Sequence, residues 1–559
     1  MPRPLKIYIK NIDKHVEIEG GTTLQEALAL LPENALGFRP ICALVNGKTE
    51  PLDFPVYRPK QVEYIPVKSS TGRATYRRSL TMILYKAFLD LYPGSKLRIE
   101  HEVSGGYYCL MSGAAPKITQ EVTDAVKARM REIVDADMPF ELREELTTDV
   151  VKIFEERDRT DEVSLLSSQY ADVYTVYYKL GDVCDIFPEA LAPSTGHISV
   201  FDLHPFHEGM LLMPPKVLDP TVPVTMKKQE KLMRAYQEYV AMNKIIGTSN
   251  IADMNKVVNS QYVAQFVTII EALHDQHFAK IAAEIAERHR QGGARVVLIA
   301  GPSSSGKTTS SMRLAVQLYT NCIVPKVIGL DNYFLDREQT PRDESGDHDY
   351  ESLYALDLKQ LNTDIKRLIA GETVPMPTFN FKEGKREYLG NTLRLGPNDV
   401  LLMEGIHGLN PDLTPYIPQE MIYKVFVSAL TTISIDDHNW VSAFDNRLLR
   451  RIIRDHKYRG TSAQETIRRW PSVRRGEEKW IFPYQENADA TINSSLLFEI
   501  AMIKPYAEAV LRQVPPSAKE FNEAHRLLRF LRYFQSVPDA DVPSTSILRE
   551  FIGGSVFNV

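Results

Sequence analysis

Cysteine is scarce and without pattern in this chain of 559 residues. Only four occur, and no two of them form a C-x-x-C pair; they are Cys42, Cys109, Cys184 and Cys322. This spacing excludes a disulfide framework and a zinc knuckle, and it is typical of a protein kept in a reducing compartment. An apolar run of 18 or more residues is also missing, as is the apolar core of a signal peptide, so we expect a cytoplasmic protein without a membrane-spanning helix.

An excess of one charge sign is lacking as well. The 66 Lys and Arg residues face 72 Asp and Glu residues, which leaves a formal net charge of −6. This balance gives no general attraction to nucleic acids or to membranes. Repeats and low-complexity segments are absent too, and the hydrophobic content of 43% is ordinary for a globular protein. Because the chain is too long for one hydrophobic core, we expect several domains.

Residues 1–67 predict a small mixed module. Alternating apolar and polar residues indicate several half-buried strands. Thr23 and Glu26 form a capping box before a short helix pattern, and Asn46-Gly47 is a strong signal for a two-residue hairpin. Strands, a helix and further strands in this order predict a β-grasp fold.

The rest of the chain changes pattern several times. Residues 68–72 are typical of a linker, 73–220 mix helices and strands, and 221–292 are helical. Residues 294–510 alternate strands with helices, and 516–559 predict a C-terminal helix and tail. The fold prediction is therefore multidomain: the β-grasp module, an α+β domain, a helical connector and an α/β domain built on a parallel sheet.

One segment of the α/β region matches the phosphate-binding pattern G-x-x-x-x-G-K-[ST]. A buried-strand pattern precedes it and a helix pattern follows it, as a P-loop requires. Its glycines let the backbone fold around phosphates, so that N–H groups and the helix N-terminus point at negative charge. We expect Lys307 to reach the β- and γ-phosphates and the Thr308 hydroxyl to bind Mg²⁺. The predicted nucleotide-binding residues are Gly301, Ser303, Ser304, Ser305, Gly306, Lys307, Thr308 and Thr309.

Two later strand patterns end in an acid. Asp331 follows the first of them, and we expect it at the carboxyl edge of the strand beside the P-loop strand, where it can accept the proton of an attacking hydroxyl. Glu404 ends the second and is a candidate partner of Mg²⁺, directly or through water. The plain alternative for Asp331 is an acid that opens the next turn.

Arginines recur along a helix pattern at residues 445–455, which continues to Arg459. Arginines on a mobile lid can close over the γ-phosphate and neutralise charge as it develops. We therefore predict Arg454 and Arg459, together with Lys307 and Asp331, as catalytic groups. A solvated charged face is the alternative, and the preceding P-loop and acids favour the lid.

These motifs, in this order, resemble the uridine kinase and phosphoribulokinase family over about residues 294–505. The family's loop, its Asp before an aromatic pair, its E-G-I and its R-R-x-x-R-D lid have counterparts at 301–309, Asp331, 404–406 and 450–455. The resemblance implies a kinase that uses ATP and Mg²⁺. It also implies the acceptor-binding positions Phe334, Glu351, Phe379, Arg386 and Arg451. The family's base-reading histidine has no counterpart near Gly384, so a nucleoside acceptor is implied and its identity stays open.

The first 220 residues resemble the N-terminal region of threonyl-tRNA synthetase, a TGS module followed by the domain that removes mischarged serine. The resemblance places the H-x-x-x-H positions of that domain at Arg78 and Met82, and its C-x-G-P-H segment at Cys184 through Glu189. The cysteine is kept and the histidines are lost, so we expect no hydrolytic editing. A replacement site would need three later histidines, which we interpret as ordinary polar loop residues: His197, His204 and His207.

RNA or tRNA is a possible partner of the N-terminal half. Residues 1–67 hold eight Lys and Arg and eight Asp and Glu, so their charge does not support strong binding to a phosphate backbone. A GTPase is disfavoured as well, because the chain has no N-K-x-D tetrapeptide.

The sequence thus predicts an ATP-dependent phosphotransferase that phosphorylates a hydroxyl of a small acceptor, with a nucleoside favoured. A kinase for another small alcohol or a sugar phosphate is one alternative, and an RNA-binding NTPase switch is another. Because every predicted kinase residue follows residue 294, we also expect a chain beginning near Thr225 to fold and keep phosphotransfer.

Overall fold

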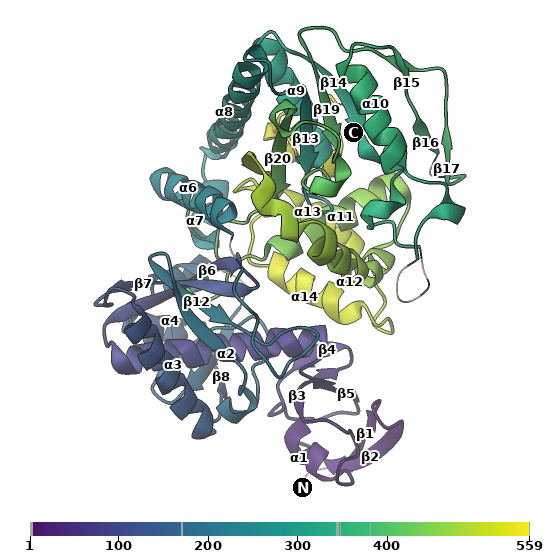
Figure 1. Ribbon diagram of the computed structural model, residues 1–559. Coiled ribbons are helices and arrows are strands. Elements are labelled where there is room, and N and C mark those ends of the chain that lie inside the picture. Colours follow the sequence, from purple (N-terminus) through teal and green to yellow (C-terminus); the bar gives the residue numbers. More distant parts are fainter. Residues whose placement is uncertain are drawn as a thin grey trace.

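The structure is a computed structural model. It describes residues 4–557 apart from 169–171, 228, 343–345, 347 and 381. Figure 1 shows a small β-rich module at the N-terminus, a mixed domain next to it, and a larger α/β part that holds the second half of the chain. The predicted combination of a β-grasp module, an α+β domain and an α/β parallel-sheet domain is confirmed. No helix within the described residues is long and apolar enough to cross a bilayer.

The N-terminal module is a five-stranded sheet packed on one short helix. Its elements are β1 (Pro4–Ile9), β2 (Lys14–Glu19), α1 (Leu24–Ala29), β3 (Pro40–Val45), β4 (Lys48–Glu50) and β5 (Gln61–Pro66). The strand order is β2-β1-β5-β3-β4, with β1 and β5 parallel. The predicted capping box forms, because Thr23 and Glu26 each accept a hydrogen bond from the other's backbone N–H. Asn46 and Gly47 make the predicted turn, with φ of 51° and 75°.

The predicted linker at residues 68–72 is wrong. Helix α2 (Ser70–Leu91) begins inside it, because the Ser69 hydroxyl accepts a hydrogen bond from the Gly72 N–H at 2.9 Å and caps the helix. Glycine is required at position 72, since a Cβ there would lie 2.0 Å from the Pro66 carbonyl oxygen. Strands β3 and β5 share a hydrophobic core with α2, so the first two modules are packed together.

The second domain consists of two antiparallel sheets and the helices that cover them. Its further elements are β6 (Ser95–Val103), β7 (Gly106–Gly113), α3 (Gln120–Asp135), β8 (Glu141–Leu146), α4 (Thr147–Glu155), α5 (Thr160–Ser168), β9 (Tyr174–Leu180), β10 (Val183–Asp185), β11 (Asp202–Phe206) and β12 (Gly209–Met213). One sheet has the order β11-β12-β7-β6 and the other β10-β9-β8. Helices α2 and α3 pack against each other over the shared core.

Three helices lead into the α/β part: α6 (Glu230–Ile246), α7 (Ile251–Val258) and α8 (Val263–Arg290). Helix α8 buries Phe278, Ile281 and Ile285 in the same core as the central parallel strands. It therefore forms one layer over the sheet that carries the P-loop, as Figure 1 shows at the upper left.

The α/β part is built on a five-stranded parallel sheet. Its strands are β13 (Val296–Ala300), β14 (Val324–Gly329), β19 (Asp399–Glu404), β20 (Ile422–Ser428) and β21 (Ala490–Asn493), in the order β14-β19-β13-β20-β21. The prediction that Asp331 follows the strand beside the P-loop strand is wrong, because β19 lies between β14 and β13. Glu404 instead ends the neighbouring strand, opposite both Ile299 and Gly329. Strand order in a parallel sheet depends on how the helical crossovers pack, and order along the chain does not reveal it.

Helices cover both faces and one end of this sheet. They are α9 (Lys307–Thr320), α10 (Leu358–Ile369), α11 (Ala443–Arg459), α12 (Ala463–Trp480), α13 (Glu499–Leu511), α14 (Phe521–Leu531) and α15 (Arg549–Ile552). Two short hairpin-like pairs lie beside α10: β15 (Val374–Pro375) with β18 (Thr392–Leu393), and β16 (Thr378–Asn380) with β17 (Lys385–Glu387). Helix α14 reaches back to β4 of the first module, where Thr49 donates to Asn522 at 2.9 Å (Figure 1).

A loop of the α/β part inserts into the second domain. It spans residues 429–442, between β20 and α11, and we call it the docking loop. His438 Nδ1 lies 2.5 Å from Asp185 Oδ2, and Asn439 donates to the Ile186 carbonyl at 2.8 Å. The Trp440 ring packs on Tyr107, with centroids 4.6 Å apart. The second domain and the α/β part are therefore joined by buried polar and aromatic contacts.

Candidate active site

The P-loop runs from the end of β13 to the first turn of α9. Gly306 is the N-cap of α9 and has φ of 81°, a left-handed conformation that favours glycine. A Cβ on Gly301 would lie 2.1 Å from the Val427 carbonyl oxygen, so that position also admits only glycine. Ser304 and Ser305 are buried within the loop. The backbone thus forms the compact turn that the sequence predicts, with the N-terminus of α9 at its end.

Two arginines of α11 bind the backbone carbonyls of this loop, a role that the sequence did not predict. Arg447 donates to the Ser303 carbonyl at 3.0 Å and forms a two-bond ion pair with Glu477 of α12. Arg450 is fully buried, donates to the Ser304 carbonyl at 3.3 Å, and pairs with Glu499. Glu477 also accepts from the Ser303 N–H. The base of the predicted lid is therefore fixed to the P-loop by buried ion pairs.

Four predicted groups meet at the carboxyl edge of the sheet: Lys307, Thr308, Asp331 and Glu404. The Thr308 hydroxyl donates to Glu404 Oε1 at 3.3 Å, and Lys307 Nζ donates to the Pro302 carbonyl at 3.2 Å. Burial raises the pKa of Glu404 to about 7, against the opposing charge of Lys307 and with the help of Asp331. Asp331 is an exposed residue of the 3-10 turn after β14. Desolvation by the protein groups around it raises its pKa, while Lys307 and Arg459 oppose the shift.

This arrangement fits Mg²⁺ and a nucleoside triphosphate. The carboxylate of Glu404 is partly buried and that of Asp331 is exposed. The two lie within electrostatic reach of each other, which is unfavourable until cations neutralise them. Mg²⁺ is usually held by one or two protein oxygens together with phosphates and water, and Thr308 with Glu404 can supply such oxygens. Among the described residues, no group of three or more His, Cys, Asp or Glu side chains could hold a metal by itself.

The three lid arginines that follow Arg450 surround one carboxylate. Arg451, Arg454 and Arg459 approach the oxygens of the buried Asp455 at 3.2, 2.9 and 3.4 Å. Arg451 also donates to the Ser303 hydroxyl at 2.7 Å, which places it at the P-loop. Arg459 is 58% exposed and lies within electrostatic reach of Asp331. Of these arginines, Arg459 therefore has both the freedom and the position to approach a transferring phosphate.

The predicted acceptor-binding residues lie in two groups. Burial and the neighbouring Glu477 raise the pKa of Glu351 to about 7, although Arg451 and Lys307 oppose the shift. This places Glu351 at the P-loop side of the site. The rings of Phe334 and Phe379 meet edge to face, with centroids 5.6 Å apart and an angle of 63° between their planes.

Arg386 is bound within the protein. Its guanidinium pairs with Asp357 at 2.9 Å, and its backbone N–H donates to the Asp336 carboxylate. It lies opposite Phe379 in the β16–β17 pair. Arg386 therefore orders the segment behind the aromatic pair in this structure.

The predicted editing positions form no hydrolytic group. Arg78 pairs with Glu189 at 3.3 Å and donates to the Ala190 carbonyl, and Met82 is fully buried in the core. Cys184 lies in a different apolar cluster, and burial raises the pKa of its thiol. His204 and His207 pair with acids at 3.4 and 3.2 Å. His197 Nδ1 accepts a hydrogen bond from the Arg39 guanidinium at 3.2 Å.

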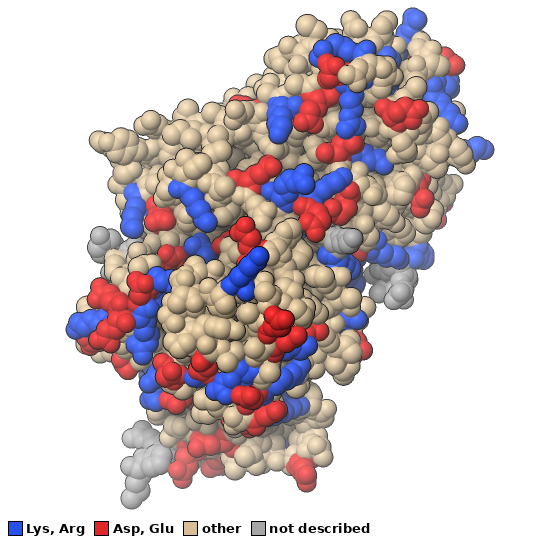
Figure 2. Space-filling view, turned by 60° about the vertical axis from the view of Figure 1, so that its left-hand side comes forward, with Lys and Arg blue, Asp and Glu red and all other residues tan. Residues whose placement is uncertain are grey.

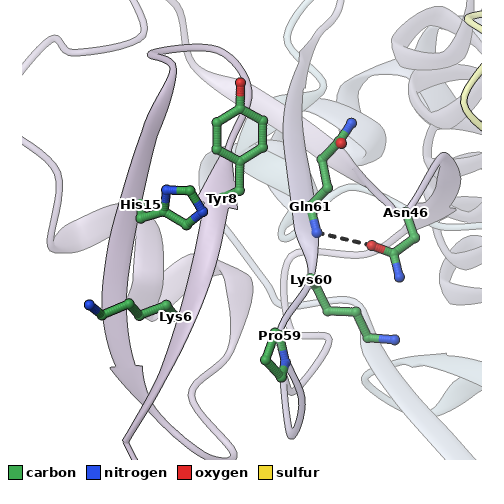
Figure 3. A pocket seen from close by; sticks show the side chains of 7 residues that line it. All are labelled: Lys6, Tyr8, His15, Asn46, Pro59, Lys60 and Gln61. Atoms are coloured by element: carbon green, nitrogen blue, oxygen red, sulfur yellow. Dashed lines mark hydrogen bonds between the residues drawn. The ribbon is translucent and has the colours of Figure 1, made fainter.

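The N-terminal module carries a shallow hollow of about 480 Å³ on the outer face of its sheet, far from the P-loop in the chain. Figure 3 shows Lys6, Tyr8 and His15 on β1 and β2, and Lys60 and Gln61 on the other side. Lys6 lies opposite an acid in the adjacent strand. On the face shown in Figure 2, basic and acidic side chains are interspersed. The charge on this surface is mixed, in agreement with the sequence.

Comparison with known proteins divides the chain in two. Residues 296–500 match the model of the phosphoribulokinase / uridine kinase family. The uridine kinase of Staphylococcus aureus is 29% identical over 198 residues, which are 35% of this chain and 86% of that protein. The N-terminal region matches the threonine–tRNA ligase of Clostridium kluyveri, 28% identical over 199 residues, which are 36% of this chain and 31% of that ligase. The chain thus spans less than a third of the length of this ligase.

Among solved structures, the D-glycerate 3-kinase from Cryptococcus neoformans var. grubii is 14% identical. The match covers 48% of this chain and 89% of that one, with a TM-score of 0.20. The family-model match and the matches to the uridine kinase and the threonine–tRNA ligase confirm the resemblance of the sequence to both families.

Proposed function

We propose that the second half of this chain is a Mg²⁺-dependent kinase that transfers the γ-phosphate of ATP to a hydroxyl of a small acceptor, with a nucleoside as the acceptor class. The observation that carries this proposal is the meeting of Lys307, Thr308, Asp331 and Glu404 at one edge of the parallel sheet. These residues come from three separate segments of the chain, and a chance P-loop-like turn would not assemble them.

Each of these residues has a chemical role in the proposed reaction. Asp331 accepts the proton of the acceptor hydroxyl, and its raised pKa brings it nearer to the range in which a general base works well. Lys307 and Arg459 bring positive charge to the phosphate, and both already interact with Asp331. Mg²⁺, when bound, neutralises charge on the β- and γ-phosphates. Thr308 and Glu404 are the residues that would hold it.

The acceptor class is proposed from the second group of residues. A carboxylate such as Glu351 accepts hydrogen bonds from hydroxyls, and the pair of Phe334 and Phe379 offers an aromatic surface against which a planar ring can pack. Sugar hydroxyls on one side and a flat base on the other describe a nucleoside. The match to uridine kinases supports the same class.

For the N-terminal half, we propose a binding or regulatory role without hydrolysis. The support is the ion pair of Arg78 with Glu189, in place of the catalytic histidines that the resemblance led us to look for. The N-terminal half contacts the docking loop, and the docking loop leads directly into α11.

The proposal is tested by following ADP formation and acceptor phosphorylation, by mass spectrometry, against a panel of nucleosides, sugar phosphates and other small alcohols. Acceptor-dependent ADP formation supports a kinase. Hydrolysis that no acceptor changes, or that RNA stimulates, would instead indicate a nucleotide switch.

Two variants of the P-loop kinase identify the roles. Lys307→Ala should abolish transfer and weaken nucleotide binding, because the lysine side chain contacts phosphates in the ground state. Asp331→Asn should mainly lower kcat, because its role begins when the hydroxyl loses its proton. Near-normal turnover of Asp331→Asn would remove Asp331 as the base.

A further inference from the structure

The C-terminal segment, residues 539–557, reaches the P-loop. Helix α15 packs on α11, and Ile547 and Phe551 belong to the same buried core as β13 and β20. A Cβ on Gly306 would lie 2.7 Å from the Ile547 side chain, so the segment touches the loop itself. Figure 1 shows the C-terminal end of the chain within the α/β part.

Glu550 of this segment binds the first turn of α9. Its Oε2 accepts from the Thr309 hydroxyl at 2.8 Å and from the Thr309 N–H at 3.3 Å. The first turn of any helix leaves backbone N–H groups without partners inside the helix. The N-cap Gly306 has no side chain with which to accept them. Glu550 therefore supplies, from 241 residues away, the acceptor that the P-loop's own N-cap lacks.

The carboxylate of Glu550 is held firmly in place. It is only 8% exposed, and the two residues that follow it are anchored by α11. The Arg450 guanidinium lies over the Phe551 ring at 5.0 Å, and Lys457 donates to the Ile552 carbonyl. Both of these cations belong to α11. The same helix therefore fixes the P-loop directly and fixes the segment that caps α9.

The position of Glu550 also carries an electrostatic cost. It lies within reach of Glu404, and the two carboxylates repel each other. Buried carboxylates are rarely brought together unless hydrogen bonds or a cation compensate them. Two bonds from Thr309 and the positive end of α9 compensate Glu550 here.

Thr309, which the sequence predicts as a nucleotide-binding residue, thus donates both its N–H and its hydroxyl to Glu550 in this structure. We propose that Glu550 is a positioning residue of the nucleotide site: by binding Thr309 it fixes the first turn of α9, and so sets Lys307 and Thr308 in their phosphate- and metal-binding orientation. This inference rests on the proposed function, since it assigns Glu550 a role at the same P-loop. It extends the kinase unit beyond the family match at 296–500 to include the end of the chain.

The test measures binding of Mg²⁺·ADP to the full-length chain by titration calorimetry. Glu550→Ala should weaken the affinity by roughly tenfold, the usual scale for loss of a charged helix cap. Glu550→Gln keeps the shape and an acceptor oxygen, so it should fall between wild type and Glu550→Ala. Asp541→Asn removes a carboxylate from the same segment and serves as the matched control, with affinity near wild type.

A second variant shows whether the effect passes through Thr309. Thr309→Val removes the hydroxyl with little change in volume, and combining it with Glu550→Ala should cost much less than the product of the two single effects. In turnover measurements on Glu550→Ala, the KM for ATP should rise and kcat should fall, while the KM for the acceptor stays unchanged. Melting temperatures of all variants are measured, so that binding is compared between folded proteins.

The outcomes separate the two proposals. If wild type fails to bind Mg²⁺·ADP, the proposed function is wrong and this inference is overturned with it. If wild type binds, and Glu550→Ala binds equally well while its melting temperature falls, Glu550 is only a structural residue and the inference alone is overturned. Weakened binding in Glu550→Ala, with Glu550→Gln between it and wild type, supports it.

Discussion

Asp185 is the residue through which we expect the N-terminal half to stabilise the kinase half. It is fully buried in the second domain and accepts hydrogen bonds from three groups. These are the Ile186 N–H at 2.9 Å, Arg159 at 3.1 Å and His438 of the docking loop at 2.5 Å. The other ring nitrogen of His438 lies 3.1 Å from the Leu97 carbonyl, and Arg159 also approaches His438 Nδ1 at 3.1 Å. Asp185→Asn removes the negative charge that compensates the buried Arg159 guanidinium, and it weakens the contact with His438.

The size of the effect follows from burial. Removing one partner of a buried ion pair costs about 3–5 kcal/mol, because the remaining charge is left without compensation. A whole domain is typically stable by only about 5–15 kcal/mol, so the variant should lose a large part of the stability at the junction. Arg159 keeps its ion pair with Glu162, and for this reason we expect about 3 kcal/mol rather than the upper value.

Tryptophan fluorescence offers a direct assay. The three tryptophans are Trp440 in the docking loop and Trp470 and Trp480 in α12. A protein with Trp470→Phe and Trp480→Phe reports on the junction alone during urea unfolding. Asp185→Asn should shift this transition to lower urea, while Asp182→Asn, an exposed acid of the same region, should change it little. A loss below about 1 kcal/mol for Asp185→Asn, within the range of a surface substitution, would refute the reasoning.

The pH dependence gives a second check on the same contact. Burial acts to raise the pKa of Asp185, but the charges of His438 and Arg159 outweigh it and hold the pKa below the ordinary value of 3.8. A depressed acid stabilises the fold above its unfolded pKa and loses this contribution as the pH falls. The difference in stability between wild type and Asp185→Asn should therefore be complete above pH 3.8 and shrink below it.

Three further predictions concern the kinase half. Arg459→Ala should lower kcat/KM by roughly 10²-fold, the scale for loss of one preorganised donor. Arg454→Ala should lower it less, because that side chain is only 16% exposed and is held by its ion pair. Loss of nucleotide affinity with kcat intact would mark both arginines as simple binding residues. The kcat/KM for the acceptor should rise as the pH passes through about 7, where Glu351 ionises. This limb should become shallower in Glu351→Gln, with Glu404, whose pKa also lies at about 7, as the remaining source; a limb that the substitution leaves unchanged would exclude Glu351. A chain beginning near Thr225 lacks the buried partners of the docking loop, so, contrary to the expectation from sequence, it should unfold at lower urea and lose activity; wild-type stability and turnover of that chain would contradict the role of the junction.

Several features were predictable from short-range sequence signals. The P-loop was predictable because phosphates are bound by consecutive backbone N–H groups, which a contiguous run of glycines and small residues must present. The hairpin at Asn46-Gly47 and the cap at Thr23 were predictable for the same reason, since each depends on the conformation of a few adjacent residues. Glu404 could also be placed, because it ends a strand pattern directly.

Long-range packing decided the rest. The order β14-β19-β13 placed Glu404 rather than Asp331 beside the P-loop strand, and no local pattern encodes the packing of crossovers. The approach of Glu550 to Thr309 and of His438 to Asp185 joins residues 241 and 253 positions apart. A charged residue in a sequence carries no sign of the partner it will meet after folding, because burial and ion pairing arise only when distant segments pack together. Local sequence patterns thus predicted the compact loop and the acids that end the strands, whereas the contacts that hold them in position arise only from the packing of distant segments.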